Sequence, residues 1–388
     1  MVDRRLVIGI IALLAASTIV PIGRRRLAAQ QQRIEEMRRI MTADPAEISG
    51  TEIDEERAIF FFPGLRRPGG RMVFDPVAHV ALRPDNDKWY VFDEHPDGRI
   101  NFSTNNRGFR EDEDTPLQTD AYRVLVLGDS HAEGVVHNAE SFANVLERLL
   151  DESRPDRAHD VLNAAVGTTG PFDYLAMLDR HAELAPDAVV VSLYSGNDFQ
   201  DGMRMSDFLT KRRTTKRTPE YTETMLDAME RWPGPVPQGF NQAHLFRFLR
   251  QDVGVAVDAC VAFTNAIAER CEDLGADLIV VALPSKPEVD GDHDRETVQA
   301  ILDAMDLNDA DLAVNTDMKE RYIAGVRAAG IRCVDPAAEM RATTEPFFWR
   351  EDHHLNVTGH ALVAELLLAE FVALTDEAAS EVETEPKR

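Results

Sequence analysis

The chain has 388 residues, of which 44% are hydrophobic and 28% charged, a composition typical of one large globular domain or of two. Its formal net charge is −26; eight arginines against three acidic residues give residues 1–40 a charge of +5, so the remainder carries −31. A body this acidic repels nucleic acid and anionic lipid, so the composition excludes a nucleic-acid partner.

The first predicted element is an apolar run from Leu6 to Ile22 with arginines on both sides. As a helix its 17 residues span roughly 25 Å, the short end for crossing a bilayer. We predict a membrane anchor in residues 1–26 of a single-pass protein, with a cleaved signal peptide as the alternative. The count of flanking arginines favours a cytoplasmic location for the domain that follows.

Two further regions precede the main domain. Residues 27–54 are predicted to form a juxtamembrane helical linker. Residues 55–121 are rich in aromatic residues, proline, glycine and asparagine, with short runs of alternating polarity. This pattern predicts a small β-rich accessory region of hairpins and loops packed beside the main domain.

From residue 122 onward, predicted strands and helices alternate along the chain. Strands are predicted at 123–128, 161–163, 187–194, 277–283 and 331–334, and helices at about 140–152, 173–184, 252–273, 315–329 and 357–373. Such alternation is typical of a parallel sheet covered on both faces. The predicted fold class is therefore α/β, a flavodoxin-like three-layer α/β/α sandwich with a mostly parallel five-stranded sheet, over residues 122–374.

Three segments interrupt or follow this alternation. An insertion at about 199–250 is aromatic and partly basic, and residues 285–312 are acidic and loop-like. Both follow the carboxyl ends of strands, where α/β sheets bind ligands, so the insertion is either a cap over the active site or a surface feature without a catalytic role. The acidic segment 375–388 is predicted to be disordered.

A candidate nucleophile follows the first predicted strand, in Val124-Leu-Val-Leu-Gly-Asp-Ser-His131. The four apolar residues predict a buried strand, and Gly-Asp ends it. Ser130 then stands between strand and helix, where backbone N–H groups can face developing negative charge.

A serine hydroxyl needs an adjacent base, and the candidate histidines lie near the C-terminus. His354 is favoured because Asp352, two residues earlier, can accept from its Nδ1–H and leave Nε2 as the base. His353 and His360 compete for the role of base, and Glu351 competes for the role of acid.

Candidate oxyanion donors follow the next two strands. Asn197, in Tyr194-Ser-Gly-Asn-Asp198, can donate from an uncharged side-chain amide. A backbone N–H in Asn163–Gly170 and the N–H of Ser130 itself are the other candidates.

Together these blocks resemble the SGNH (GDSL-type) hydrolase superfamily, in particular its bacterial membrane-anchored members. Gly128-Asp-Ser-His131 matches the nucleophile block, Gly196-Asn-Asp198 the third block and Asp352-His-His-Leu-Asn-Val-Thr-Gly359 the last. The resemblance implies ester hydrolysis through an acyl-serine intermediate, with Ser130, His354 and Asp352 as the catalytic triad.

The resemblance also implies an oxyanion hole made by Ser130, Asn197 and either Gly167 or Thr168. Many members have a glycine five residues after the block-two asparagine; this chain has Thr168 there, with Gly167 before it. The family implies a small-molecule, lipid or glycan acyl ester as substrate and no cofactor. It also places the catalytic domain on the extracytoplasmic, periplasmic side, against the arginine count.

Other functions stay open. The same triad can serve an O-acyltransferase acting on an envelope glycan, and the same fold can serve as a catalytically inactive envelope binding protein. A metal-dependent site would use Asp290-Gly-Asp-His-Asp294 with His353 and His354; we predict no metal. No Cys/His zinc pattern occurs, and Cys260, Cys271 and Cys333 are predicted to be buried free thiols.

Overall fold

The structure is a computed structural model that describes residues 69–210, 238–289 and 295–384, together with single positions elsewhere. The predicted membrane anchor (1–26) and juxtamembrane linker (27–54) lie outside the described residues.

A parallel five-stranded sheet in the order β6-β5-β7-β8-β9 forms the centre of the molecule. Its strands are β5 (Tyr122–Gly128), β6 (His159–Asn163), β7 (Ala188–Tyr194), β8 (Asp277–Leu283) and β9 (Arg332–Val334). All four neighbouring pairs are parallel. The order is 2-1-3-4-5 by position in the chain, which is the flavodoxin-like arrangement and confirms the predicted α/β fold.

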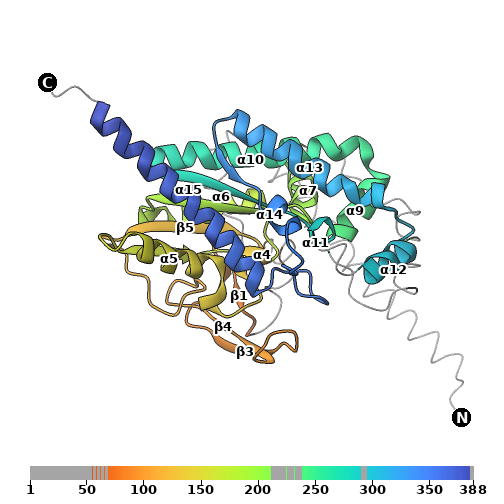
Figure 1. Cartoon of the computed structure of the whole chain (residues 1–388), viewed down its shortest axis with the longest axis horizontal. Coiled ribbons are helices and arrows are strands. Elements are labelled where there is room, and N and C mark those ends of the chain that lie inside the picture. Colours follow the sequence, from red (N-terminus) through yellow and green to blue (C-terminus); the bar gives the residue numbers. More distant parts are fainter. Residues whose placement is uncertain are drawn as a thin grey trace, which may run out of the picture.

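Helices cover both faces of this sheet (Figure 1). One face packs against α5 (Phe142–Ser153) and α15 (Val357–Thr384), and the other against α6 (Pro171–His181), α10 (Val253–Leu274) and α13 (Asp309–Ala328). The side chains of β5 show why: Val124 and Val126 join the core of the first face, and Leu125 and Leu127 join the core of the second. Period-2 alternation of apolar residues therefore builds two cores around one sheet.

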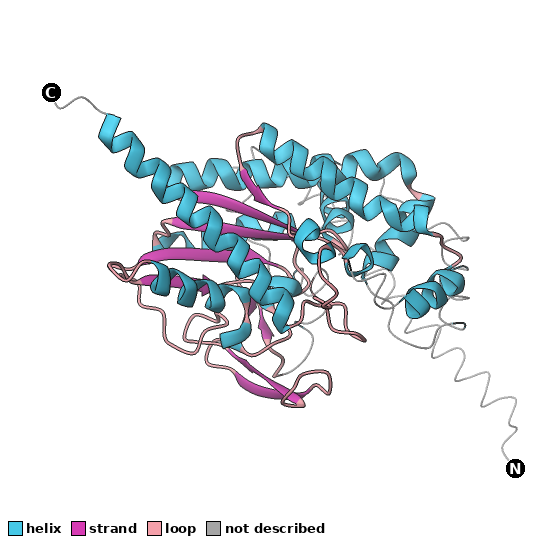
Figure 2. Cartoon of the chain, viewed as in Figure 1, coloured by secondary structure: helices cyan, strands magenta, loops and turns pink. Residues whose placement is uncertain are grey.

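Two antiparallel hairpins precede the sheet, as expected for the accessory region (Figure 2). They pair β1 (Met72–Val73) with β2 (Ala81–Leu82) and β3 (Asp87–Val91) with β4 (Arg99–Ser103). Arg110 ties this region to the main domain, since its buried guanidinium donates to the backbone carbonyls of Glu133, Gly134 and Val136 at 2.8–2.9 Å. Burial lowers the pKa of Arg110 to about 10, so it stays charged at neutral pH.

The prediction of a loop at 285–312 is wrong. The segment holds α11 (Lys286–Val289), α12 (Arg295–Met305) and the start of α13, with residues 290–294 outside the described part. Within its acidic composition, Val298, Ile301, Leu302 and Met305 recur at helical spacing and pack on Phe240 of α9 (Gln238–Phe248). The acidic composition of the segment therefore concealed the apolar pattern of a small helical core.

The final helix also differs from expectation. It begins at Val357, as predicted, but continues to Thr384 through most of the segment predicted to be disordered. Alanine, leucine and glutamate make up most of the whole helix Val357–Thr384, and all three have high helix propensity.

Within the described residues, Val357–Leu374 of α15 is long and apolar enough to cross a membrane, by length and composition alone. Its residues Val363, Ala364, Leu367 and Phe371 are buried in the core shared with α5 and the sheet. The three cysteines are buried and free, as predicted.

Candidate active site

The sharp turn after β5 presents Ser130 at the start of α4 (Ser130–Glu133). Asp129 has an extended backbone (φ −88°, ψ −153°), and its carboxylate caps the helix by accepting the N–H of His131 at 2.8 Å. Gly128 is required here, since a Cβ at this position would lie 2.6 Å from the Cβ of Ala132. The strand order reverses between β5 and β7, and α/β folds bind ligands at the carboxyl ends of the strands beside such a switch point. Ser130 follows β5 and therefore lies at this position.

His354 comes from the loop before α15 and meets Ser130 across this edge of the sheet. Its Nε2 lies 2.8 Å from Oγ of Ser130, and its Nδ1 is hydrogen-bonded to Oδ1 of Asp352. Oδ1 of Asp352 also accepts the backbone N–H of His354 at 2.9 Å. The structure thus brings Ser130, His354 and Asp352 into one hydrogen-bonded series.

Protonation of this series follows from the acceptor at its end. Burial alone would raise the pKa of Asp352, but the hydrogen bond from His354 and the charge of that ring outweigh burial, so the pKa lies well below its usual value. Asp352 is therefore an ionised acceptor at neutral pH. It holds a proton on Nδ1 of His354 and leaves the lone pair of Nε2 facing the serine hydroxyl.

The competing residues make other contacts. Glu351 has a side chain that is 72% exposed and pairs with Arg350 at 3.1 Å. His360 is buried in α15, where its Nδ1 accepts the N–H of Phe142 at 3.1 Å. His353 lies beside His354, with ring centroids 4.3 Å apart.

The start of α15 fixes the position of the His354 loop. Asn356 caps the helix by accepting the N–H of Gly359 at 2.9 Å, and its amide donates to the carbonyl of Pro346 at 2.8 Å. A Cβ on Gly359 would lie 2.3 Å from the carbonyl oxygen of Phe347, so only glycine allows this close approach. This explains why a glycine follows the histidine by five residues.

Two residues distant in sequence also hold this loop. Glu94, in the β3–β4 hairpin, accepts the N–H groups of Glu351 and Asp352 at 3.0 and 3.2 Å. Lys286 donates to the carbonyl of Trp349 at 2.7 Å. Sequence reasoning missed both, because an acid in a hairpin turn and a lysine after a strand are ordinary surface residues until the loop lies on them.

Asn197 follows β7 and reaches toward the serine turn. Its Nδ2 lies 3.3 Å from Oδ2 of Asp129 and 3.5 Å from Oδ2 of Asp201. The next residue, Asp198, accepts from the N–H of Tyr194 at 2.9 Å and from the hydroxyl of Tyr174 at 3.1 Å. Asp198 therefore braces the loop that carries Asn197.

The carboxylates beneath this part of the site have unusual pKa values. Burial raises the pKa of Asp129 to about 6 and that of Asp173 to about 7. It also raises the pKa values of Asp198 and Asp201, and repulsion from Asp129 adds to the shift of Asp198. These acids lie close together, and the exposed Arg204, which pairs with Asp201 at 3.0 Å, offsets the shifts only in part.

The two candidate backbone donors after β6 differ. The N–H of Gly167 donates to Oε2 of Glu133, whose side chain is 2% exposed and whose Oε1 pairs with Arg71 at 2.9 Å. Thr168 is exposed and has a φ of 72°, in the left-handed region that favours glycine. Gly167 is thus already engaged, and Arg71, from the accessory region, and Glu133 were missed by sequence reasoning.

The insertion reaches the same site through α9. Oε1 of Gln238 lies 3.4 Å from Nε2 of His131, the residue after Ser130. The predicted metal motif at 290–294 lies outside the described residues.

Comparison with known proteins finds a family model that matches part of the chain. Residues 249–388 match the family model described as "SGNH hydrolase-like domain, acetyltransferase AlgX". This range contains Asp352 and His354 but not Ser130. No curated protein sequence matches the chain.

Several solved structures are similar to the chain. A GDSL-like lipase from Bacteroides thetaiotaomicron is 11% identical, with 65% of this chain and 89% of that one covered and a TM-score of 0.37. The acetylxylan esterase Axe2 from Geobacillus stearothermophilus is 14% identical, with coverages of 64% and 93% and a TM-score of 0.40. These TM-scores are low and carry no argument. The matched model over residues 249–388 and the sequence blocks described above support the SGNH hydrolase superfamily.

Proposed function

We propose that this protein is a serine esterase that cleaves an ester or O-acyl bond through an acyl-serine intermediate. The observation that carries the proposal is the 2.8 Å contact between Nε2 of His354 and Oγ of Ser130, with Nδ1 of the same ring on Asp352. This arrangement has the three roles that serine hydrolysis requires: a nucleophile, a base and an acceptor that orients the base.

The mechanism follows from these roles. Oγ of Ser130 attacks the carbonyl carbon while Nε2 of His354 takes its proton, and the ionised Asp352 stabilises the imidazolium. The tetrahedral intermediate collapses, the C–O bond to the alcohol breaks, and His354 returns the proton to the leaving oxygen. Water then attacks the acyl-serine with the same base, releasing the acid and restoring the serine.

The oxyanion would be held by the N–H of Ser130, the N–H of Thr168 and the amide of Asn197, which would exchange its 3.5 Å contact with Asp201 for the oxyanion. The first N–H groups of a helix have no intrahelical acceptor, which suits Ser130 for this role. Thr168 is favoured over Gly167 because Gly167 already donates to Glu133 and because Thr168 has the left-handed backbone that a glycine would adopt. Each donor would contribute roughly 10²–10³ in rate.

The direct test uses Ser130→Ala with Ser153→Ala, in α5, as the matched control. We expect Ser130→Ala to abolish turnover of p-nitrophenyl acetate with unchanged circular dichroism, and the control to keep full activity. A fluorophosphonate probe should label Ser130 in peptide mapping. Unchanged turnover in Ser130→Ala would reject the mechanism, and a folded protein that takes up no probe would favour an inactive binding scaffold.

An O-acyltransferase is the second candidate, because the matched family model is described as an acetyltransferase. Here the acyl group of the acyl-serine would pass to a glycan hydroxyl instead of water. Product analysis with and without an acetyl-accepting glycan separates the two: acylated glycan at the expense of free acetate supports transfer, and free acetate alone supports hydrolysis.

We further propose that residues 1–26 anchor the protein in a membrane with the main domain on the extracytoplasmic, periplasmic side. The apolar run and the resemblance to membrane-anchored relatives support this placement. Protease treatment of intact spheroplasts should degrade the domain; full protection until lysis would place it in the cytoplasm.

A further inference from the structure

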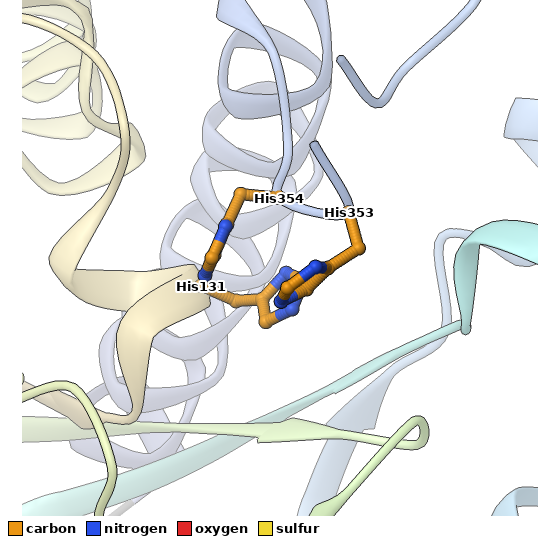
Figure 3. A group of neighbouring side chains, drawn as sticks. All are labelled: His131, His353 and His354. Carbon is orange, nitrogen blue, oxygen red and sulfur yellow. The ribbon is translucent and has the colours of Figure 1, made fainter. Parts of the chain in front are cut away.

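Three imidazoles gather at one place (Figure 3), and that of His354 is hydrogen-bonded to Ser130. His131 comes from α4, and His353 and His354 come from the loop before α15. One nitrogen of each ring can be chosen so that the three lie within 4.8 Å of one another. The centroid of the His354 ring is 4.7 Å from that of His131 and 4.3 Å from that of His353.

Two of these rings present a nitrogen lone pair. Nδ1 of His354 is held by Asp352, so Nε2 carries the lone pair. On His131, Nε2 lies 3.4 Å from the side-chain oxygen Oε1 of Gln238, which can only accept. With Nε2 as the donor in this contact, Nδ1 is left unprotonated. Nδ1 of His131 is buried and has no hydrogen-bond partner among the described residues. A buried acceptor without a partner is costly, and a metal ion would satisfy it.

The third ring lies within reach of the same ion. The centroid of the His353 ring is 4.3 Å from that of His354 and 5.9 Å from that of His131.

A second cluster, formed by His95, His137 and Glu140, differs because its imidazoles have no free lone pair. Nδ1 of His95 accepts the N–H of Asp97 at 3.1 Å, and Nδ1 of His137 accepts that of Asn101 at 3.0 Å. Both Nε2 atoms must then carry hydrogens, and that of His95 donates to Glu140 at 3.0 Å. Neither ring has a lone pair left for a metal ion. Nε2 of His137 has no hydrogen-bond partner among the described residues, but it faces Oδ2 of Asp97 at 3.4 Å.

We propose that His131, His353 and His354 bind one divalent transition-metal ion of the Zn²⁺ type, and that this ion reversibly inhibits the enzyme. Imidazole nitrogens suit Zn²⁺, and a three-histidine set leaves a fourth position for water. Inhibition follows because the ion takes the Nε2 lone pair that would otherwise deprotonate Ser130. Binding stands independently of the proposed esterase function, whereas inhibition rests on it.

The geometry requires a modest adjustment. Tetrahedral Zn²⁺ with Zn–N bonds of about 2.1 Å places its ligands roughly 3.4 Å apart, so the rings must close by about an ångström. His353 is on a loop, while His131 and His354 are oriented by Gln238 and Asp352, so the adjustment falls to His353. Such outer partners commonly fix the ring orientation of ligating histidines.

Binding is tested on the full chain after treatment with a chelator, using Co²⁺ as a spectroscopic probe. We expect the visible absorption of tetrahedral Co²⁺ to appear at one ion per chain and Zn²⁺ to displace it. His353→Ala should weaken Co²⁺ affinity at least about tenfold, and His137→Ala, the control from the second cluster, should not change it. His131→Gln gives a second ligand variant. Absence of the spectrum in folded protein, or equal affinity in His353→Ala, would overturn the site.

Inhibition is measured with p-nitrophenyl acetate. Zn²⁺ should reduce turnover with a midpoint equal to its binding constant, and chelator should restore it. His353→Ala should shift the midpoint by the same factor as its affinity, with turnover expressed relative to the metal-free rate of the same variant. Zn²⁺ binding at these residues without inhibition, or with activation, would reject the inhibitory role. If even metal-free protein is inactive, the esterase proposal fails while the Co²⁺ spectrum still decides the metal site.

Discussion

On the serine side of the site, burial raises the pKa of Asp129 to about 6, whereas on the histidine side the pKa of Asp352 lies below its usual value. The serine side is built from turns at the ends of central strands, and its acids lie buried together. The histidine side is a loop, and its acid has an imidazole partner. The contrast teaches that burial alone raises the pKa of a carboxyl group, while burial beside a hydrogen-bonding histidine lowers it.

The largest effect is expected on the histidine side. Asp352→Asn should lower kcat for p-nitrophenyl acetate by roughly 10³–10⁴, because an amide can donate to Nδ1 and favour the wrong tautomer of His354. The exposed neighbour, changed as Glu351→Gln, should keep activity within about twofold. A loss in Glu351→Gln as large as that in Asp352→Asn would assign the acid to Glu351.

The serine side predicts a pH effect on stability. The pKa of Asp173 is about 7 in the folded protein against about 3.9 when unfolded, so between these values only the unfolded chain ionises and stability falls as pH rises. Asp173→Asn should remove this fall, raising the free energy of unfolding at pH 8 by up to about 4 kcal/mol and leaving it unchanged near pH 4. Urea unfolding at several pH values measures this.

The control for that experiment is Asp156→Asn, which changes an exposed acid. It should leave the pH profile of stability as it is. A profile for Asp173→Asn parallel to that of the unmodified chain would show that Asp173 is ionised in the folded protein.

Removing the hydrogen bonds from the histidine loop to Glu94 should have an intermediate effect on kcat. Glu94→Ala removes the acceptor for the N–H groups of Glu351 and Asp352, so His354 should lose its alignment with Ser130. We expect kcat to fall about 10- to 100-fold, the scale of a small misplacement of a catalytic group. Asp93→Ala, at the adjacent exposed position, should have no effect. Equal kcat in both variants would mean that the position of the histidine loop does not depend on Glu94.

The smallest effect concerns Thr168. Its backbone at φ 72° is strained for a β-branched residue, so Thr168→Gly should stabilise the protein by about 0.5–1 kcal/mol. Activity should persist, because the proposed contribution is a backbone N–H. Thr168→Ala keeps a Cβ and should give less stabilisation, and thermal unfolding of the two variants measures the difference. An equal melting temperature for both would show that the backbone of Thr168 is not strained in the folded protein.

Much of the fold could be predicted because its signals are local. The five strands lie within two residues of the predicted positions, since buried parallel strands are short apolar runs between turns. Helix α12 was not predicted, because its apolar positions are spread through an acidic segment and only the packing on Phe240 gives them a core. The acidic composition of residues 375–388 predicts disorder, but α15 continues to Thr384. The alanines and glutamates there also favour a helix.

The sequence by itself determined the residue types and blocks of the site: the Gly-Asp-Ser turn, the Gly-Asn-Asp turn and the Asp-x-His motif with its glycine. Tertiary structure decided which residues meet. It put His354 rather than His353 or His360 on Ser130, engaged Gly167 with Glu133, and brought Glu94 and Arg71 from the accessory hairpins to the site. The physical reason is that strand and turn propensities act over a few residues, whereas a hydrogen bond between positions 224 residues apart exists only once the sheet and its two cores have formed.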